Sequence, residues 1–174
     1  MKRNIQLWDE AGYILEQVGK GVLLTTAAEG KVNTMTIGWG TLGIEWRKNI
    51  FTVFVRESRY TKELLDKNPE FTVNIPYGAY DKSILSVCGT RSGRDMDKIK
   101  ELGLEIEESK TVSVPGIRQL PLTLECKVIY RQKQDENAIN AENTKKYYPR
   151  ETPEQDGDYH TAYYGQITAA YVIE

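Results

Sequence analysis

Short apolar runs and alternating apolar and polar positions predict a mainly β protein. The clearest alternation spans 122–130, where Leu122, Leu124 and Cys126 fall on one face, and Thr123 and Glu125 fall on the other. A period of two over this length is typical of a half-buried strand. The other segments with strand character are 21–27, 33–39, 50–55, 71–75 and 161–173.

Helix and turn signals lie between these strands. Gly30, within Glu-Gly-Lys, predicts a hairpin turn with positive φ, and Gly165 predicts a bend in the last strand. Ser58 and Asp95 stand where the caps of two helices are expected, and Gly103 suits the left-handed residue at a helix end. The segments expected to be helical are 12–18, 60–67, 95–102 and 137–148, with a short turn at 83–87 and a long loop at 148–158.

This order of elements favours an antiparallel barrel. Six strands with helices inserted between them, and no regular alternation of strand and helix, argue against a doubly wound sheet. The segment 38–43 matches G-x-G-x-x-G, but that motif indicates a dinucleotide site only where it follows a strand and opens a helix. A turn and another strand follow here, so we interpret these glycines as points of chain bending or of close approach by a flat ligand. We expect residues 1–174 to form one domain.

Composition narrows the range of partners. The formal net charge of −2 gives no support to nucleic acid or an anionic membrane as the main partner, because both need a basic face. Cys88 and Cys126 are too few for a disulfide framework, and with His160 as the one histidine they argue against a zinc site. We interpret both cysteines as structural. No signal-peptide pattern or membrane-length apolar stretch stands out, so we expect a cytoplasmic protein.

Segment 56–62, Arg-Glu-Ser-Arg-Tyr-Thr-Lys, is the most informative for chemistry. It joins a predicted strand to a predicted helix and brings Arg56, Ser58 and Arg59 to the helix N-terminus. Unpaired N–H groups and the helix dipole favour an anion there, and arginine can bind phosphate through two parallel hydrogen bonds. An ordinary helix cap with solvated charges uses the same groups, so the spacing alone leaves a phosphate site and a cap equally open.

Three further features are ambiguous when each is taken alone. Strand 33–39, Asn-Thr-Met-Thr-Ile-Gly-Trp, has short polar side chains that would expose its backbone to a planar partner or simply form a polar outer face. Loop 88–98 carries two arginines, Lys98 and two glycines, which suits a flexible cover over an anionic ligand as well as an ordinary surface loop. A lone histidine such as His160 is more often structural than catalytic.

Taken together and in this order, these segments resemble the flavin reductase-like family, whose members include flavoredoxins. The segments that carry the resemblance are 21–27, 33–39, 56–61, 71–75, 92–98 and 160–165, and they span nearly the whole chain. The resemblance implies a six-stranded antiparallel split β-barrel, mainly β with inserted helices. It also implies that the barrel binds FMN without a covalent bond and forms homodimers, with the flavin near the subunit interface.

The resemblance also assigns residues to the flavin. The polar residues of strand 33–39 would line the flavin and its ribityl chain, and segment 56–61 would hold the phosphate region. The expected cofactor-binding residues are Asn33, Thr34, Met35, Thr36, Trp39, Arg56, Ser58, Arg59, Tyr60, Thr61, Arg94, Lys98, His160 and Tyr164. No catalytic residue is assigned, because the flavin itself would supply the redox chemistry.

By the same resemblance, we expect an NAD(P)H-dependent flavin or acceptor reductase, in which a nicotinamide cofactor binds transiently and passes hydride to FMN. A flavoredoxin-like electron carrier and a non-enzymatic FMN-binding protein remain alternatives, and an oligonucleotide-binding barrel is a more remote one. The electron acceptor, small molecule or protein, and the choice between NADH and NADPH stay open. Segment 133–158 departs from the shorter family members, and we expect it to shape a substrate pocket or a dimer contact.

Overall fold

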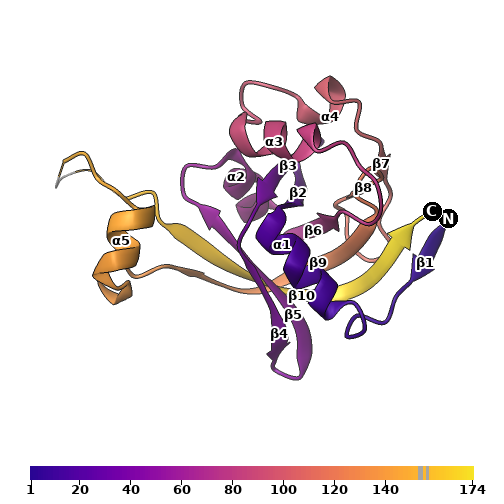
Figure 1. Cartoon of the computed structure of the whole chain (residues 1–174), viewed down its shortest axis with the longest axis horizontal. Coiled ribbons are helices and arrows are strands. Elements are labelled where there is room, and N and C mark those ends of the chain that lie inside the picture. The colour runs from indigo at the N-terminus through magenta and orange to yellow at the C-terminus, as the bar shows by residue number, and fades with distance from the viewer. Residues whose placement is uncertain (153–154, 156) are drawn as a thin grey trace.

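The computed structural model describes residues 1–152, 155 and 157–174 and is built around an eight-stranded antiparallel sheet (Figure 1). The strands follow the order β3-β2-β6-β9-β10-β5-β4, and β1 pairs with β10. Their bounds are β1 Lys2–Asn4, β2 Val22–Ala28, β3 Lys31–Ile37, β4 Gly40–Glu45, β5 Lys48–Arg56, β6 Glu70–Ile75, β9 Leu122–Lys133 and β10 His160–Ile173. A separate pair consists of β7 (Ile106–Glu107) and β8 (Gly116–Ile117).

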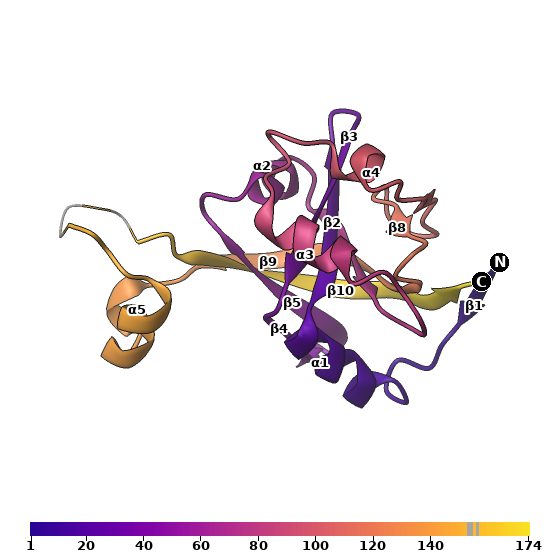
Figure 2. The ribbon, with the colours of Figure 1, turned by 45° about the horizontal axis from the view of Figure 1, so that its top comes forward.

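Helices occupy the connections between strands. They are α1 (Ala11–Lys20), α2 (Tyr60–Lys67), α3 (Ser83–Thr90), α4 (Lys98–Glu101) and α5 (Ala141–Tyr147), with a 3-10 turn at Glu136–Ala138. In α1, Ile14 and Val18 lie one turn apart, and both are buried in the main core. α3 and α4 lie on the same side of the molecule and both contact β3 (Figure 2). This placement positions the loop between α3 and α4 beside that strand.

Two apolar clusters hold these layers together. The larger cluster includes Leu24, Phe51, Phe71 and Tyr163, and it fills the space enclosed by the sheet and α1. The smaller cluster joins Leu23 to side chains of the 84–120 region, namely Ile84, Cys88, Leu104, Ile117 and Leu120. Successive side chains of a strand point to opposite faces, so Leu23 and Leu24 enter different clusters and β2 is buried on both faces.

All six predicted strands are present, and they are consecutive neighbours in the sheet from β3 to β5. The structure adds β4, which contains Gly40 and Gly43 of the glycine segment interpreted as a point of bending and forms a hairpin with β5. The hairpin turns at Trp46 and Arg47, within the turn predicted after residue 43, and their φ values of 50° and 58° are uncommon for residues other than glycine. Most of the G-x-G-x-x-G segment lies in β4 and is followed by β5, so it lacks the helix that a dinucleotide-binding motif opens.

The predicted bounds of helix 60–67 are confirmed, but its predicted cap is wrong. Arg59 occupies the N-cap position, and no side-chain hydrogen bond closes that end. Ser58 lies one residue earlier, and its hydroxyl bonds instead to a residue far along the chain, Asp158. The short turn predicted at 83–87 is the full helix α3.

The helix predicted at 95–102 is shorter than expected. α4 begins at Lys98, and Asp97 rather than Asp95 caps it by accepting a hydrogen bond from the N–H of Lys100 at 3.1 Å. Both aspartates suit a cap, and the sequence does not distinguish them. The left-handed residue predicted at Gly103 is confirmed, with φ of 58°.

The predicted alternation holds in β9 from Leu122 to Val128, but a register shift against β10 precedes Tyr130, which is exposed, and two residues of the polar face are buried. Thr123 and Glu125 are fully buried beneath the loop that precedes β8. Glu125 accepts hydrogen bonds from the backbone N–H groups of Lys110 and Thr111, at 2.7 and 2.6 Å, and from the hydroxyls of Thr111 and Tyr171. Burial opposes ionisation of this carboxyl, but these hydrogen bonds outweigh burial and hold the pKa of Glu125 below its ordinary value.

Replacing Glu125 with glutamine will lower the free energy of unfolding by about 1–2 kcal/mol. The NH2 group of the amide would face a buried backbone N–H that now donates to the carboxylate, and two donors cannot bond to each other. Because the pKa of Glu125 is lower in the folded protein than in the unfolded chain, the carboxylate stabilises the fold at pH values above its unfolded-state pKa. This stabilisation is lost as pH falls through its folded-state pKa. Urea unfolding at pH 7 and pH 3 tests this. If the free energy of unfolding fell equally in the wild type and in Glu125→Gln between pH 7 and pH 3, the prediction would be contradicted.

Strands β9 and β10 continue beyond the main body as a ribbon that carries α5 (Figures 1 and 2). We call residues 133–158 the arm. The helix predicted at 137–148 is divided there into the 3-10 turn and α5. The bend predicted at Gly165 is confirmed by a register shift against β9, and a Cβ at Gly165 would come within 2.4 Å of the Phe71 ring. In the part of the chain described, no helix is long and apolar enough to cross a membrane.

Candidate functional site

A groove formed by two adjoining hollows runs beside β3, the strand at one end of the sheet order. One hollow, of about 140 Å³, is lined by Asn33, Met35, Thr36, Ser58, Arg59, Tyr60, Thr61, Cys88, Gly89, Arg91, Ser92, Gly93, Arg94 and Lys98. We call it the cationic hollow. The other, of about 190 Å³, is lined by Met35, Thr36, Ile37, Gly38, Trp39, Phe54, Arg56, Arg59 and His160, and we call it the aromatic hollow. They share Met35, Thr36 and Arg59.

The side chains of β3 divide between the groove and the interior. Asn33 donates from Nδ2 to the hydroxyl of Thr61 at 2.9 Å, which joins β3 to the first turn of α2. Thr36 donates to the carbonyl oxygen of Leu85 in α3 at 2.6 Å. Thr34 is fully buried and bonds to Thr25 of the neighbouring strand, so its side chain does not line either hollow. Thr34 contributes its backbone to this region instead.

The loop between α3 and α4 closes over the cationic hollow. A Cβ at Gly93 would lie 2.1 Å from Oδ1 of Asn33 and 2.8 Å from the Tyr60 ring, so only glycine permits this approach. Arg94 donates to the carbonyl oxygen of Ser58 at 2.9 Å and pairs with Glu63 of α2. These contacts occupy its guanidinium, so Arg94 holds the loop against α2 and is not a free cation.

Lys98 is the buried charge of the site. Its side chain belongs to a residue only 4% exposed, and Nζ donates to the carbonyl oxygens of Thr34 and Cys88, each at 3.0 Å. No carboxylate within the described residues forms an ion pair with it, and burial lowers its pKa below the ordinary value. An ammonium has three donors, so one remains for a ligand in the cationic hollow. A buried charge is costly unless something pairs with it, and an anionic ligand would do so.

Arg59 lies where the two hollows meet. It is exposed, and its guanidinium forms no hydrogen bond or ion pair with any residue that the structure describes. Arg91, also exposed, lies in the loop over the cationic hollow. Arg59 and Lys98 therefore place two uncompensated positive charges along one groove.

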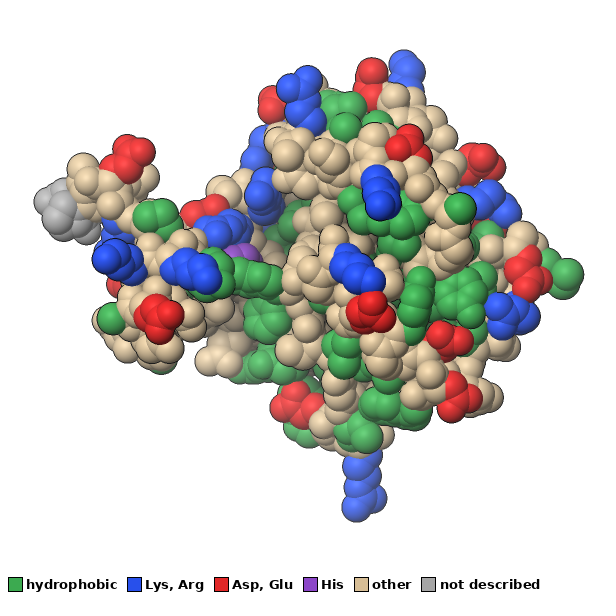
Figure 3. Space-filling view, in the orientation of Figure 1, with side chains coloured by type: hydrophobic (Ala, Val, Ile, Leu, Met, Phe, Trp, Pro, Cys, Tyr) green, Lys and Arg blue, Asp and Glu red, His purple; other side chains and the backbone are tan. Residues whose placement is uncertain are grey.

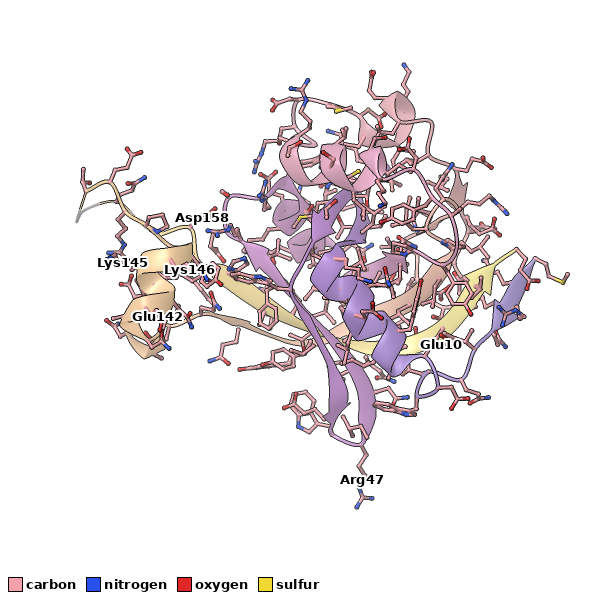
Figure 4. The ribbon with its side chains drawn as sticks, viewed as in Figure 1. Glu10, Arg47, Glu142, Lys145, Lys146 and Asp158 are labelled. Atoms are coloured by element: carbon pink, nitrogen blue, oxygen red, sulfur yellow. The ribbon has the colours of Figure 1, made fainter. Side chains whose placement is uncertain are left out.

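Ser58 is already hydrogen-bonded to a carboxylate. Its N–H and its hydroxyl donate to the two oxygens of Asp158, at 2.9 and 2.6 Å. Asp158 lies at the end of the arm and is labelled in Figure 4 where the arm meets the main body. Two donors converging on one carboxylate resemble the way that a phosphate is held. A phosphate at Ser58 would have to displace Asp158, whereas one at Arg59 would not.

Replacing Asp158 with asparagine will raise the affinity for a phosphate-bearing ligand about three- to fivefold, because it removes a negative charge beside the cationic hollow. The control is Glu142→Gln on exposed α5, which makes the same charge change elsewhere on the arm. Isothermal titration with FMN and with riboflavin measures both variants. A weaker affinity for FMN in Asp158→Asn would contradict this prediction.

The aromatic hollow is built where the arm meets the body. The ring of Trp39 lies 4.9 Å from that of His160 and 5.1 Å from that of Tyr147. In Figure 3, the histidine is visible between the arm and the main body, with basic side chains beside it. Arg56 donates to the carbonyl oxygens of Tyr147 and Asp158, both at 2.9 Å, and so fastens the arm to β5. Burial, and then the charge of Arg56, lowers the pKa of His160 to about 4.

The groove brings together all of the predicted site residues except two. One is the Thr34 side chain described above. The other is Tyr164, which packs against Tyr130 with ring centroids 5.1 Å apart and lines neither hollow. Tyr164 lies four residues beyond His160 on β10, so the strand carries it away from the groove.

The sequence did not indicate several neighbours of the site. All of them come from the arm: Tyr147 and Tyr148 at the end of α5, Asp158 at the end of the arm, and Gln134 directly after β9. The run of aromatic and charged residues in the arm was a signal for function but did not say which of them would reach the groove. Cys88 lines the cationic hollow, but burial raises the pKa of its thiol, which supports the structural interpretation.

Comparisons with known proteins agree with this architecture. The family described as flavin reductase like domain matches residues 15–174. An uncharacterized protein of Archaeoglobus fulgidus is 34% identical over 99 residues, which cover 57% of this chain and 55% of that protein. The uncharacterized protein YddH of Escherichia coli is 28% identical over 114 residues, 64% of this chain and 59% of that protein. The chain thus spans little more than half the length of these two relatives.

Solved structures show the same fold. Flavoredoxin from Methanosarcina acetivorans is similar with a TM-score of 0.64 and 27% identity, covering 88% of this chain and 68% of that one. The FMN-binding domain of a flavin reductase-like enzyme from Shewanella baltica has a TM-score of 0.67 at 17% identity, covering 99% and 77%. The predicted antiparallel split barrel is confirmed. Because the family match extends over most of the chain, the protein belongs to the flavin reductase-like domain family.

Proposed function

We propose that this protein binds FMN without covalent attachment in the groove beside β3 and uses it as an NAD(P)H-dependent flavin or acceptor reductase. The observation that carries the proposal is the pair of uncompensated cations, Lys98 and Arg59, in the cationic hollow. A phosphorylated ligand supplies the missing negative charge. Membership of the family, and the FMN named for the Shewanella baltica domain, support the choice of ligand.

The residues of the groove fit the parts of FMN. Arg59 and Arg91 would hold the phosphate, with the hydroxyl of Ser92 as a further donor. Asn33, Met35 and Thr36 would lie along the flavin and its ribityl chain, and Trp39 would lie at the aromatic end. Bound FMN supplies hydride and one-electron chemistry. The protein's part is to hold the cofactor and, through Lys98, to stabilise negative charge near it.

The absorbance of the purified protein tests cofactor binding. We expect flavin absorbance that leaves with the supernatant after heat denaturation, as for a non-covalent cofactor. Chromatography of the supernatant distinguishes FMN from FAD and riboflavin. Colourless protein that cannot be reconstituted with FMN would refute the proposal.

A flavoredoxin-like electron carrier is the second candidate, favoured by the likeness to the Methanosarcina acetivorans flavoredoxin. Anaerobic mixing of the holoprotein with NADH or NADPH separates the two. A reductase loses its oxidised-flavin absorbance rapidly with at least one nicotinamide. A carrier does not, but after chemical reduction it passes electrons to a protein acceptor faster than free FMN does.

We also propose that a second copy of the chain covers an exposed apolar face. Trp46 and Tyr130 have ring centroids 6.1 Å apart and are 56% and 41% exposed, and Ile44 and Ile129, which lie beside them in the chain, are also exposed. Contiguous exposed aromatic groups commonly mark an interface. Sedimentation equilibrium tests for the homodimer, and a monomer across the micromolar range would refute it.

A further inference from the structure

Three residues from separate elements form a hydrogen-bonded chain at the aromatic hollow. Tyr148, at the end of α5, lies with its hydroxyl 2.9 Å from Oε1 of Gln134 and 2.8 Å from Nδ1 of His160. The backbone N–H of His160 also donates to Oε1 of Gln134 at 3.0 Å. Tyr148 and His160 are both buried, at 4% and 6% exposure.

These bonds determine which nitrogen of His160 carries the proton. The atom of Gln134 that accepts the His160 N–H must be the amide oxygen, because the amide nitrogen is only a donor. That oxygen has no hydrogen, so the Tyr148 hydroxyl must donate to it. The hydroxyl has one proton and must therefore accept from Nδ1 of His160. Nδ1 carries the hydrogen, and Nε2 keeps a lone pair.

The surroundings keep His160 neutral. Arg56 lies 5.2 Å from the Tyr148 ring, and Arg59 lines the same hollow as the histidine. Burial and these positive charges disfavour protonation, while Asp158 opposes them less strongly. No residue that the structure describes bonds to Nε2, and the ring lines the aromatic hollow beside Trp39 and Met35.

We propose that Tyr148 and Gln134 position His160 so that Nε2 accepts a hydrogen bond from an N–H or O–H group of a ligand in the aromatic hollow. Tyr148 and Gln134 are positioning residues, and the ligand class is a neutral ring that carries a hydrogen-bond donor, such as a carboxamide. The nicotinamide of NAD(P)H satisfies this description, and that part of the inference rests on the proposed function. The tautomer itself does not depend on flavin.

The single histidine makes the tautomer directly measurable. In protein labelled with ¹⁵N-histidine, long-range ¹H–¹⁵N NMR spectra at pH 7 should show protonated Nδ1 and unprotonated Nε2. Tyr148→Phe should shift the spectrum toward the other tautomer or a mixture. The matched control, Tyr147→Phe, changes the adjacent tyrosine, which contacts Trp39 by its ring, and should leave the tautomer unchanged. Protonated Nε2 in the wild type, or no change in Tyr148→Phe, would overturn the positioning role.

A pair of probes tests the ligand class. Nicotinamide carries a carboxamide N–H, and methyl nicotinate has a similar ring without that donor. In the holoprotein, the Nε2 resonance should move with nicotinamide and not with methyl nicotinate. Equal movement with both probes, or with neither, would overturn the ligand assignment. Because the tautomer is read in flavin-free protein, failure of the FMN proposal is recognised separately by the absorbance test.

Discussion

Replacing Arg59 with alanine will weaken FMN binding by about ten- to hundredfold. Its guanidinium lies where the two hollows meet and is not engaged by any residue that the structure describes. Charge-assisted hydrogen bonds to a phosphate contribute roughly 1.5–3 kcal/mol, which sets this range. Riboflavin lacks the phosphate, so its affinity should change much less. Fluorescence titration of flavin-free protein with both ligands measures the difference.

The structure offers a matched control for Arg59. Arg47 lies at the tip of the β4–β5 hairpin, is exposed and points away from the molecule (Figure 4). Arg47→Ala removes the same charge and should leave both affinities unchanged. If Arg59→Ala weakened FMN and riboflavin equally, Arg59 would act on the ring or on the fold and not on a phosphate. Ser58→Ala should have a smaller effect than Arg59→Ala, because Asp158 already occupies the donors of Ser58.

Replacing Lys98 with methionine will weaken FMN binding by on the order of a hundredfold while changing the stability of flavin-free protein by less than about 1 kcal/mol. The two effects differ because the ammonium is buried without a carboxylate partner within the described residues. Methionine removes the cost of burying that charge, which offsets the loss of hydrogen bonds to Thr34 and Cys88. FMN binding, in contrast, loses the attraction of this cation, and methionine offers the phosphorylated ligand no interaction that replaces it.

The measurements for Lys98 are flavin titration and urea unfolding of the same flavin-free samples. Lys100→Met is the control, since Lys100 lies two residues along α4 and is exposed. It should change neither quantity. A Lys98→Met protein that lost as much stability as binding energy would show that Lys98 supports the loop and not the ligand. A lower midpoint potential of the FMN bound to Lys98→Met would further support a role in stabilising reduced flavin.

The strands of the barrel could be predicted because each is a local signal. The alternation in 122–130 and the apolar run in 50–55 each specify a strand without reference to the rest of the chain. β4 was missed because Gly40 and Gly43, which lie in it, were interpreted as points of chain bending, although the turn that follows was predicted. The buried polar face of β9 was missed because the loop that covers Glu125 is held by the carboxylate itself, and periodicity does not report such a contact.

Much of the candidate site could also be predicted, for a different reason. Segments 33–39 and 56–61 carry short polar and cationic residues at a strand and at a helix start, where backbone donors are free. The spacing could not show which of those donors would already be occupied. Ser58 and Asp158 lie 100 residues apart, and their contact exists only because β10 returns beside β5.

By itself, the sequence determined the strand order along the chain, the positions of the cations and the presence of a single histidine. The tertiary structure alone decided which cations are compensated, which face of each strand is covered, and which nitrogen of His160 is free. These properties depend on partners brought together from distant segments. Local patterns of residues specify conformation, whereas charge compensation and hydrogen-bond direction are set by what the completed fold places within bonding distance.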